Sequence, residues 1–336
     1  MAGKAKGENV QAPGWAPDAT MLGDRHRLAG LEPDNLLAFM ALLGLLRALE
    51  SVCPAWRPRA FWDVETHPWR PVLTLAAPQT EAAIAAAAVE GVQKLAVAHD
   101  ATGNANDLKF TAVDFRNLRD QADQAGRDVL DALACDAATR TDKSDDALWP
   151  TPFAFMFGQG HQHFLDRFRS VPAGLSRESG ADGRTTHGSA AIAAALFAPW
   201  RRADRTDGFR WDPVEDRRYA LRARAPSGDP ATTEQGANCL AAIALPLLPV
   251  TPIRRRGEAR VLAPMTSYSP SGNIAFSWPI WAAPATLAAI LALLRHPELA
   301  EERPKTGRMP HACAIFRASR ISVGKYFNVT SAVRIA

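Results

Sequence analysis

The stretch Leu36–Leu49, LLAFMALLGLLRAL, restricts the fold more than any other part of the chain. Its residues are apolar on nearly every face of a helix, and Pro33 is suited to the first helical turn. A helix that is apolar all round is stable in water only when it is buried. We therefore expect a buried helix that packs on a sheet. This stretch and a second apolar stretch, Trp281–Leu294, are too short to cross a bilayer.

Composition is typical of a globular protein. The chain has 336 residues, of which 47% are hydrophobic and 22% are charged. Residues 1–20 are polar and rich in Pro and Gly, so we expect a flexible tail and no secretory signal, and hence a cytoplasmic protein without membrane contact. The cysteines Cys53, Cys135, Cys239 and Cys313 form no C-x-x-C pair, which argues against a zinc knuckle or a disulfide framework.

Local patterns predict a mixed α/β (α+β) fold in which strands alternate with buried helices. The predicted strands are DRHRLAGL, a hairpin formed by RAFWDVE and WRPVLTLAA, LKFTAVDFRNL, FAFMF, and two strands within Ala314–Ile335. The predicted helices are Glu81–Ala98, Leu118–Ala134, HQHFLDRFRSV, Ala190–Phe197 and one that starts at Gly236. The polar residues 136–150 predict a connection between an N-terminal lobe, 21–135, and a C-terminal lobe, 151–336.

Arginines gather in two places, and both are candidates for phosphate contact because guanidinium groups bind phosphate and stack on bases. The first cluster comprises Arg201, Arg202, Arg205, Arg210, Arg217, Arg218, Arg222 and Arg224, with Trp200, Phe209, Trp211 and Tyr219 interleaved. Its alternative interpretation is internal ion pairing with Asp204, Asp207, Asp212, Glu215 and Asp216. The second cluster is Arg254, Arg255, Arg256 and Arg260, which only Glu258 opposes.

The stretch FMFGQGHQHFLDRF, Phe155–Phe168, predicts a strand, a glycine turn and a helix. Gly158, Gly160 and His161 can then present backbone N–H groups to a phosphate, although the ending of a P-loop is missing. His161 and His163 are two residues apart, a spacing that converges poorly on one metal ion in a strand or a helix, so we predict no metal and no cofactor. The alternative is a metal-assisted hydrolase or nuclease that uses both histidines with Asp166, Asp114 or Asp100.

Two further loops are candidates for nucleic-acid contact. SRESGADGRTTHGSA has the composition of a surface loop and offers Arg177, Arg184 and His187 for contact with a backbone. YSPSGNIAFSWPIW has a glycine turn between two aromatic segments, where a base can be held. For its Trp278 and Trp281, ordinary core packing is the simpler expectation.

One segment carries a resemblance to a known family. It contains FRWDP followed by EDRRYALR, then Gly236-Ala237-Asn238 at the predicted helix start, and LPLLP at 245–249. These residues resemble the type I-G (formerly I-U) CRISPR-associated proteins, the Cas8-like large or accessory subunits of the Cascade effector complex. The N-terminal LAGLEPDNLLAFMALLGLLRALE is also similar to such proteins. The resemblance implies a non-catalytic protein that works beside guide RNA, target DNA and the backbone and guide-processing subunits.

The sequence therefore predicts a nucleic-acid-binding subunit of a type I CRISPR complex. The alternatives are the hydrolase or nuclease centred on His161 and His163, and a scaffold that contacts only protein. The predicted nucleic-acid-binding residues are Arg254, Arg255, Arg256, Arg260, Arg217, Arg218, Arg222, Arg224, Arg210, Trp211, Arg177, Arg184, Gly158, Gly160 and His161.

Overall fold

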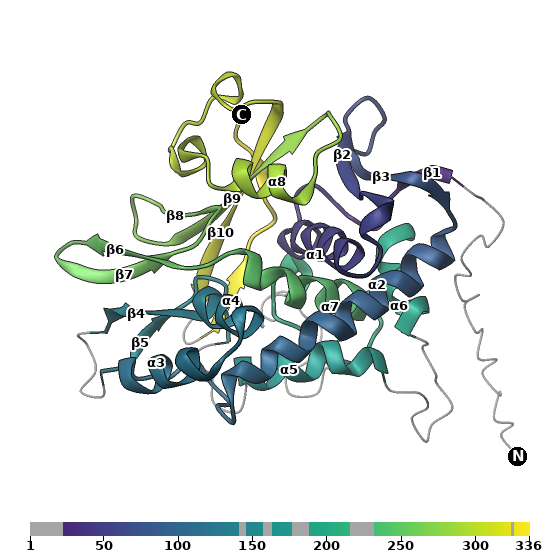
Figure 1. Cartoon of the computed structure of the whole chain (residues 1–336). Coiled ribbons are helices and arrows are strands. Elements are labelled where there is room, and N and C mark those ends of the chain that lie inside the picture. Colours follow the sequence, from purple (N-terminus) through teal and green to yellow (C-terminus); the bar gives the residue numbers. More distant parts are fainter. Residues whose placement is uncertain (1–22, 141–145, 157–162, 177–187, 216–231, 324–325) are drawn as a thin grey trace, which may run out of the picture.

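A computed structural model describes residues 23–140, 146–156, 163–176, 188–215, 232–323 and 326–336 (Figure 1). The described residues form a mixed α+β fold, as the sequence predicts. Its α-helices are α1 (Leu36–Val52), α2 (Glu81–Ala96), α3 (Ala112–Gln121), α4 (Gln124–Leu133), α5 (Phe164–Ala173), α6 (Gly188–Phe197), α7 (Gln235–Ala244) and α8 (Leu287–Leu294). Buried apolar residues from Leu28 to Ala332 form a continuous cluster that draws on both predicted lobes. The division into two lobes at residues 136–150 stays a prediction.

The strands form small antiparallel sheets. One sheet has the order β1-β3-β2, with β1 Gly23–Arg27, β2 Arg59–Asp63 and β3 Arg70–Gln79, so the predicted hairpin is confirmed. A second has the order β11-β10-β9-β8, and β12 also pairs with β10. Its strands are β8 Thr266–Tyr268, β9 Ile274–Trp281, β10 Ala312–Val323, β11 Tyr326–Val329 and β12 Val333–Arg334. Two separate pairs are formed by β4 (Ala134–Thr139) with β5 (Leu148–Pro150), and by β6 (Thr251–Arg255) with β7 (Glu258–Leu262).

Helix α1 is buried among other elements, as its all-round apolar surface predicts. It begins after Asn35, whose side chain accepts a hydrogen bond from the Ala38 N–H, and it packs against α7 and α2. At Gly44 the backbone of Leu240 in α7 comes so close that a Cβ would lie 1.9 Å from the Leu240 carbonyl oxygen. Phe39 stacks on Trp278 of β9 with their ring centroids 5.5 Å apart. The helix therefore packs on a sheet, and Trp278 belongs to the core.

Three local predictions are wrong. LKFTAVDFRNL was expected to be a strand, but Thr111 caps helix α3 by accepting a hydrogen bond from the Asp114 N–H. FAFMF was expected to be a strand, but residues 153–156 are buried turns. Leu118–Ala134 was expected to be one helix, but α3 ends at Gln121 and Asp123 caps α4 by accepting a hydrogen bond from the Gly126 N–H. Helix caps set the elements in the first and third of these segments, and in the second the side chains are buried without strand pairing.

The second apolar stretch, Trp281–Leu294, is not one helix. Trp281 ends strand β9, and α8 starts after Thr286, which caps it. Across the part of the chain that the structure describes, no helix combines the length and the apolar character needed to cross a membrane.

Candidate nucleic-acid interface

The second arginine cluster lies on the β6–β7 hairpin, which extends on the side of the molecule opposite β1–β3 (Figure 1). Arg256 and Gly257 connect the two strands with φ angles of 50° and 85°. Two successive positive φ angles define a tight hairpin turn, in which glycine is favoured at the second position. Arg254 and Arg256 are exposed at this turn, whereas Arg255 is half-buried. The sequence RRRG therefore places three guanidinium groups at the tip of a hairpin.

Arg255 is held against the sheet beside the hairpin. Its guanidinium carbon lies 4.4 Å from the centroid of the Tyr268 ring in β8. On another side it approaches Gly272, where a Cβ would lie 3.3 Å from a guanidinium nitrogen. Gly272 also has a φ of 94°, so a larger residue there would strain the backbone as well as crowd the arginine. The ring contact is a cation–π interaction, and it fixes where the positive charge lies.

Arg260 forms a second cationic–aromatic group on the other strand of the hairpin. Its guanidinium carbon lies 3.9 Å from the centroid of the Trp149 ring in β5, and that of Arg140 lies 4.8 Å from the same ring. Arg260 also forms an ion pair with Glu258, the one acidic residue near this cluster in the sequence. Trp149 therefore attaches the hairpin to the β4–β5 pair and brings Arg140 into the same basic surface.

Tyr268 connects the hairpin to Arg320, a half-buried arginine of β10. Burial raises the pKa of the Tyr268 hydroxyl, while the guanidinium groups of Arg260, Arg320 and Arg255 lower it. Arg320 lies over the Phe327 ring at 4.6 Å, and burial lowers its pKa to about 10, so it stays protonated at neutral pH. Arg255 of β6 thus lies over the Tyr268 ring, and Arg260 of β7 and Arg320 of β10 add positive charge that acts on its hydroxyl.

Carboxylates neutralise little of this surface. Within the described ranges, no carboxylate forms an ion pair with Arg254, Arg255 or Arg256, and Glu258 pairs with Arg260. We refer to Arg254, Arg255, Arg256, Arg260, Tyr268 and Trp149 as the hairpin surface. Its uncompensated guanidinium groups and its aromatic rings are what a nucleic-acid backbone and unpaired bases require.

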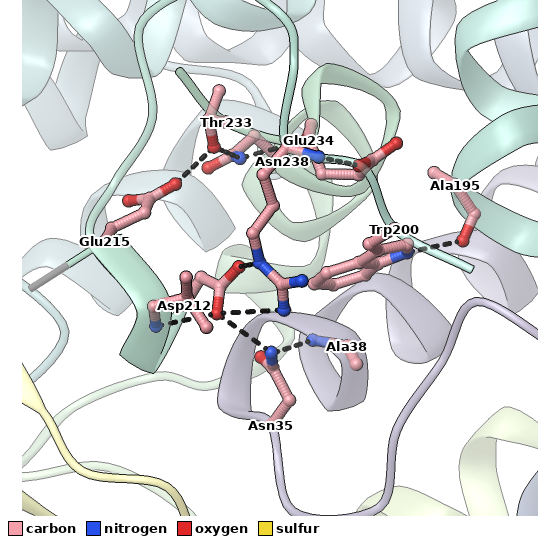
Figure 2. Close-up of polar contacts among 11 residues, drawn as sticks. Asn35, Ala38, Ala195, Trp200, Asp212, Glu215, Thr233, Glu234 and Asn238 are labelled. Atoms are coloured by element: carbon pink, nitrogen blue, oxygen red, sulfur yellow. Dashed lines mark hydrogen bonds and ion pairs between the residues drawn. The ribbon is translucent and has the colours of Figure 1, made fainter. Parts of the chain in front are cut away.

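The first arginine cluster is different at Arg202, which belongs to a network of internal contacts (Figure 2). The Arg202 Nε donates a hydrogen bond to the buried Asp212 carboxylate at 2.6 Å, and its guanidinium carbon lies 5.4 Å from the centroid of the Trp200 ring. Asp212 also accepts hydrogen bonds from the Asn35 side chain at 3.0 Å and from the Val214 N–H at 3.1 Å. Burial lowers the pKa of Arg202, but the Asp212 contact outweighs it and leaves this pKa raised. For Arg202, the internal ion pairing that the sequence offered as an alternative is therefore confirmed.

Trp211 and Arg210, both predicted to touch nucleic acid, lie next to this network. Trp211 is fully buried, stacks on Phe209 at 4.5 Å and donates its indole N–H to the Phe153 carbonyl at 2.9 Å. It is a core residue in this structure and has no face on which a base can stack, so this prediction is corrected. Arg210 is half-buried and has a φ of 62°.

The network also joins the two flanks of residues 216–231. The Thr233 hydroxyl donates a hydrogen bond to the Glu215 carboxylate and accepts one from the Asn238 side chain at 2.8 Å (Figure 2). Burial raises the pKa of Glu215 to about 7, and burial also raises the pKa of Glu234 to about 6, although the Arg202 N–H donates to Glu234. Both carboxyl groups gain a share of the neutral form near pH 6. The contact between Glu215 and Thr233 holds together the two described ends that flank residues 216–231.

Several predicted residues lie outside the described residues: Arg217, Arg218, Arg222, Arg224, Arg177, Arg184, Gly158, Gly160 and His161. His187 lies outside them too. His163 is described and directly precedes α5. In the described ranges, no group of three or more His, Cys, Asp or Glu side chains is placed to hold a metal ion.

Sequence reasoning missed three residues of this region: Trp149, Arg140 and Arg320. They come from strands or loops far from residues 254–260 in the chain, and no local pattern connects them. The glycine turn in YSPSGN was a usable signal, because it contains Tyr268 and Gly272, which hold Arg255. The chain as a whole matches no protein-family model, no curated protein and no solved structure.

Proposed function

We propose that this protein is a cytoplasmic nucleic-acid-binding subunit of a type I CRISPR effector complex, and that the hairpin surface contacts the backbone of guide RNA or target DNA. The observation that carries the proposal is the exposed tip of β6–β7. It presents Arg254 and Arg256, which have no carboxylate partner among the described residues. The proposed partners are the guide RNA, the target DNA and the other subunits of the Cascade complex.

The physical argument rests on the charge and rigidity of the hairpin surface. A nucleic-acid backbone carries one charge per phosphate, and each arginine that neutralises a phosphate releases a condensed counterion. The tight turn at Arg256 and Gly257 limits the backbone freedom of the tip. The ring of Tyr268 orients Arg255, so less side-chain entropy is lost on binding.

The resemblance of FRWDP, EDRRYALR and the Gly236-Ala237-Asn238 helix start to type I-G proteins supports the choice of complex. In such complexes base pairing reads the sequence, and protein contacts the shape and the backbone of the nucleic acid. Uncompensated arginines on a hairpin suit that task, because they recognise phosphate irrespective of sequence.

A pull-down of the tagged chain, expressed with its neighbouring genes, tests this function. We expect the wild-type chain to co-purify with a discrete guide RNA and with other subunits, and R254E/R256E to lose most of the RNA. The matched control is R59E, because Arg59 is an exposed strand arginine of β2, away from the hairpin (Figure 1).

Nuclease treatment separates this function from a protein-only scaffold. One contrary result is that the other subunits stay bound after nuclease treatment. If, in addition, R254E/R256E recovers as much RNA as R59E without nuclease, the hairpin surface does not contact RNA and the proposal fails. Turnover of a nucleic acid by the purified chain, lost on His161→Ala, would replace it with the nuclease alternative.

A further inference from the structure

A cavity of about 320 Å³ lies directly beside the hairpin surface. Its lining comes from the hairpin, from β8, β9 and β10, and from the segment after the short helix Pro297–Ala300. The side chains used below are Arg255, Ser267, Tyr268, Glu302, Arg317 and Ser319. This volume is within the range of pockets that hold small organic groups.

The floor of the cavity is a row of small residues in register across three strands. Ser267 of β8 pairs with Ala275 of β9, and Ala275 pairs with Ser319 of β10. Residues that face each other across antiparallel strands project from the same face of the sheet. A hydroxyl, a methyl and a second hydroxyl therefore form the floor. Each hydroxyl can both donate and accept a hydrogen bond.

Arg255 and Tyr268 also line the cavity, and Tyr268 follows Ser267 in β8. The ring contact and the close approach of Gly272 fix the plane of the Arg255 guanidinium. A guanidinium held in this way is a flat surface on which another planar group can stack. Because Arg255 belongs both to the hairpin surface and to the lining of the cavity, the cavity adjoins the hairpin surface.

Arg317 also lines the cavity, and most of its donors are already used inside the protein. Its guanidinium donates to the Leu299 carbonyl at 3.0 Å and to the Glu301 carbonyl at 2.6 Å, and its Nε donates to the Ser277 hydroxyl at 2.8 Å. It contributes positive charge but little hydrogen bonding to a guest. Glu302 adds an exposed carboxylate to the lining, which repels a phosphate and accepts hydrogen bonds from N–H groups.

We infer that this cavity holds one unpaired nucleobase of the strand whose backbone follows the hairpin tip; the inference rests on the proposed function and identifies what that surface reads. A base is planar and so stacks on Arg255. It carries both donors and acceptors for Ser267 and Ser319. Its amino group, where it has one, is complementary to Glu302. The phosphates on either side stay outside, against Arg254 and Arg256.

The test measures the affinity of the purified full-length chain for a short single-stranded oligonucleotide by fluorescence anisotropy. The probes are the intact strand and a set of strands in which one position after another is abasic, which keeps every phosphate. For the wild type, we expect one abasic position to weaken binding by about 5-fold to 160-fold, the range for one stacked base. Two variants remove the site: S319L fills the cavity, and R255K keeps the charge but loses the flat stacking surface.

We expect each variant to bind the intact strand only as tightly as the wild type binds that abasic strand. The affinity of each variant for the abasic strand should equal that of the wild type. R255K guards against a folding defect of S319L, and melting temperatures of both variants establish that they fold. A contrary result is that the wild type binds the strand while both variants still bind the abasic strand more weakly than the intact strand, by the same factor as the wild type. In that case the cavity does not hold the base, and the proposed function stands without this inference. If the wild type binds no strand, the proposed function fails and this inference fails with it.

Discussion

The Arg202 side chain and the Asp212 carboxylate form an ion pair at 2.6 Å in which the Asp212 side chain has no exposed surface. The same carboxylate accepts from Asn35, which caps helix α1. One buried charge therefore joins the central helix to the chain that leads into the arginine-rich segment. A buried carboxylate with these partners is stabilised only while all of them stay in place.

Asp212→Asn should destabilise the fold, because it leaves the Arg202 guanidinium without its charge partner. Losing one partner of a fully buried pair costs about 3–5 kcal/mol, and we expect about 2–3 kcal/mol here because Arg202 is partly exposed. Urea denaturation measures the difference. The control is Asp207→Asn, which breaks the ion pair of Asp207 with Arg167, where the Asp207 side chain is 57% exposed. It should cost at most about 1 kcal/mol; equal costs for the two variants would contradict the role of Asp212.

Glu215→Gln should change how stability depends on pH. Burial raises the folded pKa of Glu215 from 4.5 to about 7. The unfolded state therefore ionises at lower pH than the folded state, and the free energy of unfolding of the wild type declines as pH rises from about 4.5 to about 7. Gln cannot ionise and can still accept from Thr233. The variant should gain stability relative to wild type across this window, by up to about 3 kcal/mol.

Thermal melts at closely spaced pH values measure this effect as the difference between the two proteins. Taking the difference removes the contribution of His99, whose pKa burial lowers to about 3 and which acts in the opposite direction between pH 3 and 6.5. Glu65→Gln, at an exposed position, is the control and should give a curve parallel to wild type. A Glu215→Gln curve that is also parallel would show that the Glu215 carboxyl ionises alike in both states.

Gly44→Ala should separate helices α1 and α7. The added methyl would lie 1.9 Å from the Leu240 carbonyl oxygen, so the helix backbones must move apart. The overpacking cost of about 1–3 kcal/mol exceeds the gain of about 1 kcal/mol in helix propensity. Calorimetry should therefore show a lower melting temperature. Gly307→Ala is the control: its added methyl group meets nothing within 4 Å, so the melting temperature should stay unchanged. If Gly44→Ala also left the melting temperature unchanged, α1 and α7 would not cross this closely.

The elements that could be predicted are those whose signal is local. Helix α1 follows from apolar residues on all its faces, and the β2–β3 hairpin follows from two tryptophan-bearing extended segments. The segment of helix α3 alternates like a strand, and only the cap formed by Thr111 and Asp114 indicates the helix. Capping is as local as periodicity, and the sequence TAVD carried it.

The candidate site could be predicted only in part, because its halves are far apart in the chain. The run Arg254–Arg256 is visible in the sequence, but its contact with Tyr268 depends on how β6 packs beside β8. Trp211 shows the opposite error: an aromatic residue among arginines resembles a stacking platform, yet its burial against Phe209 makes it part of the core. Long-range packing decides which arginines reach solvent.

The salt dependence of binding should count the phosphate contacts of the hairpin tip. If Arg254 and Arg256 each neutralise one phosphate, removing either should reduce the slope of log K against log salt by about 0.7 for a single strand. We expect R254A and R256A each to show this reduction, and the double variant to show twice as much, because each substitution removes one exposed charge and so one counterion-releasing contact. R59A, which removes an exposed arginine of β2, should keep the wild-type slope. Weaker binding of R254A and R256A with an unchanged slope would mean that these arginines shape the hairpin and do not contact phosphate.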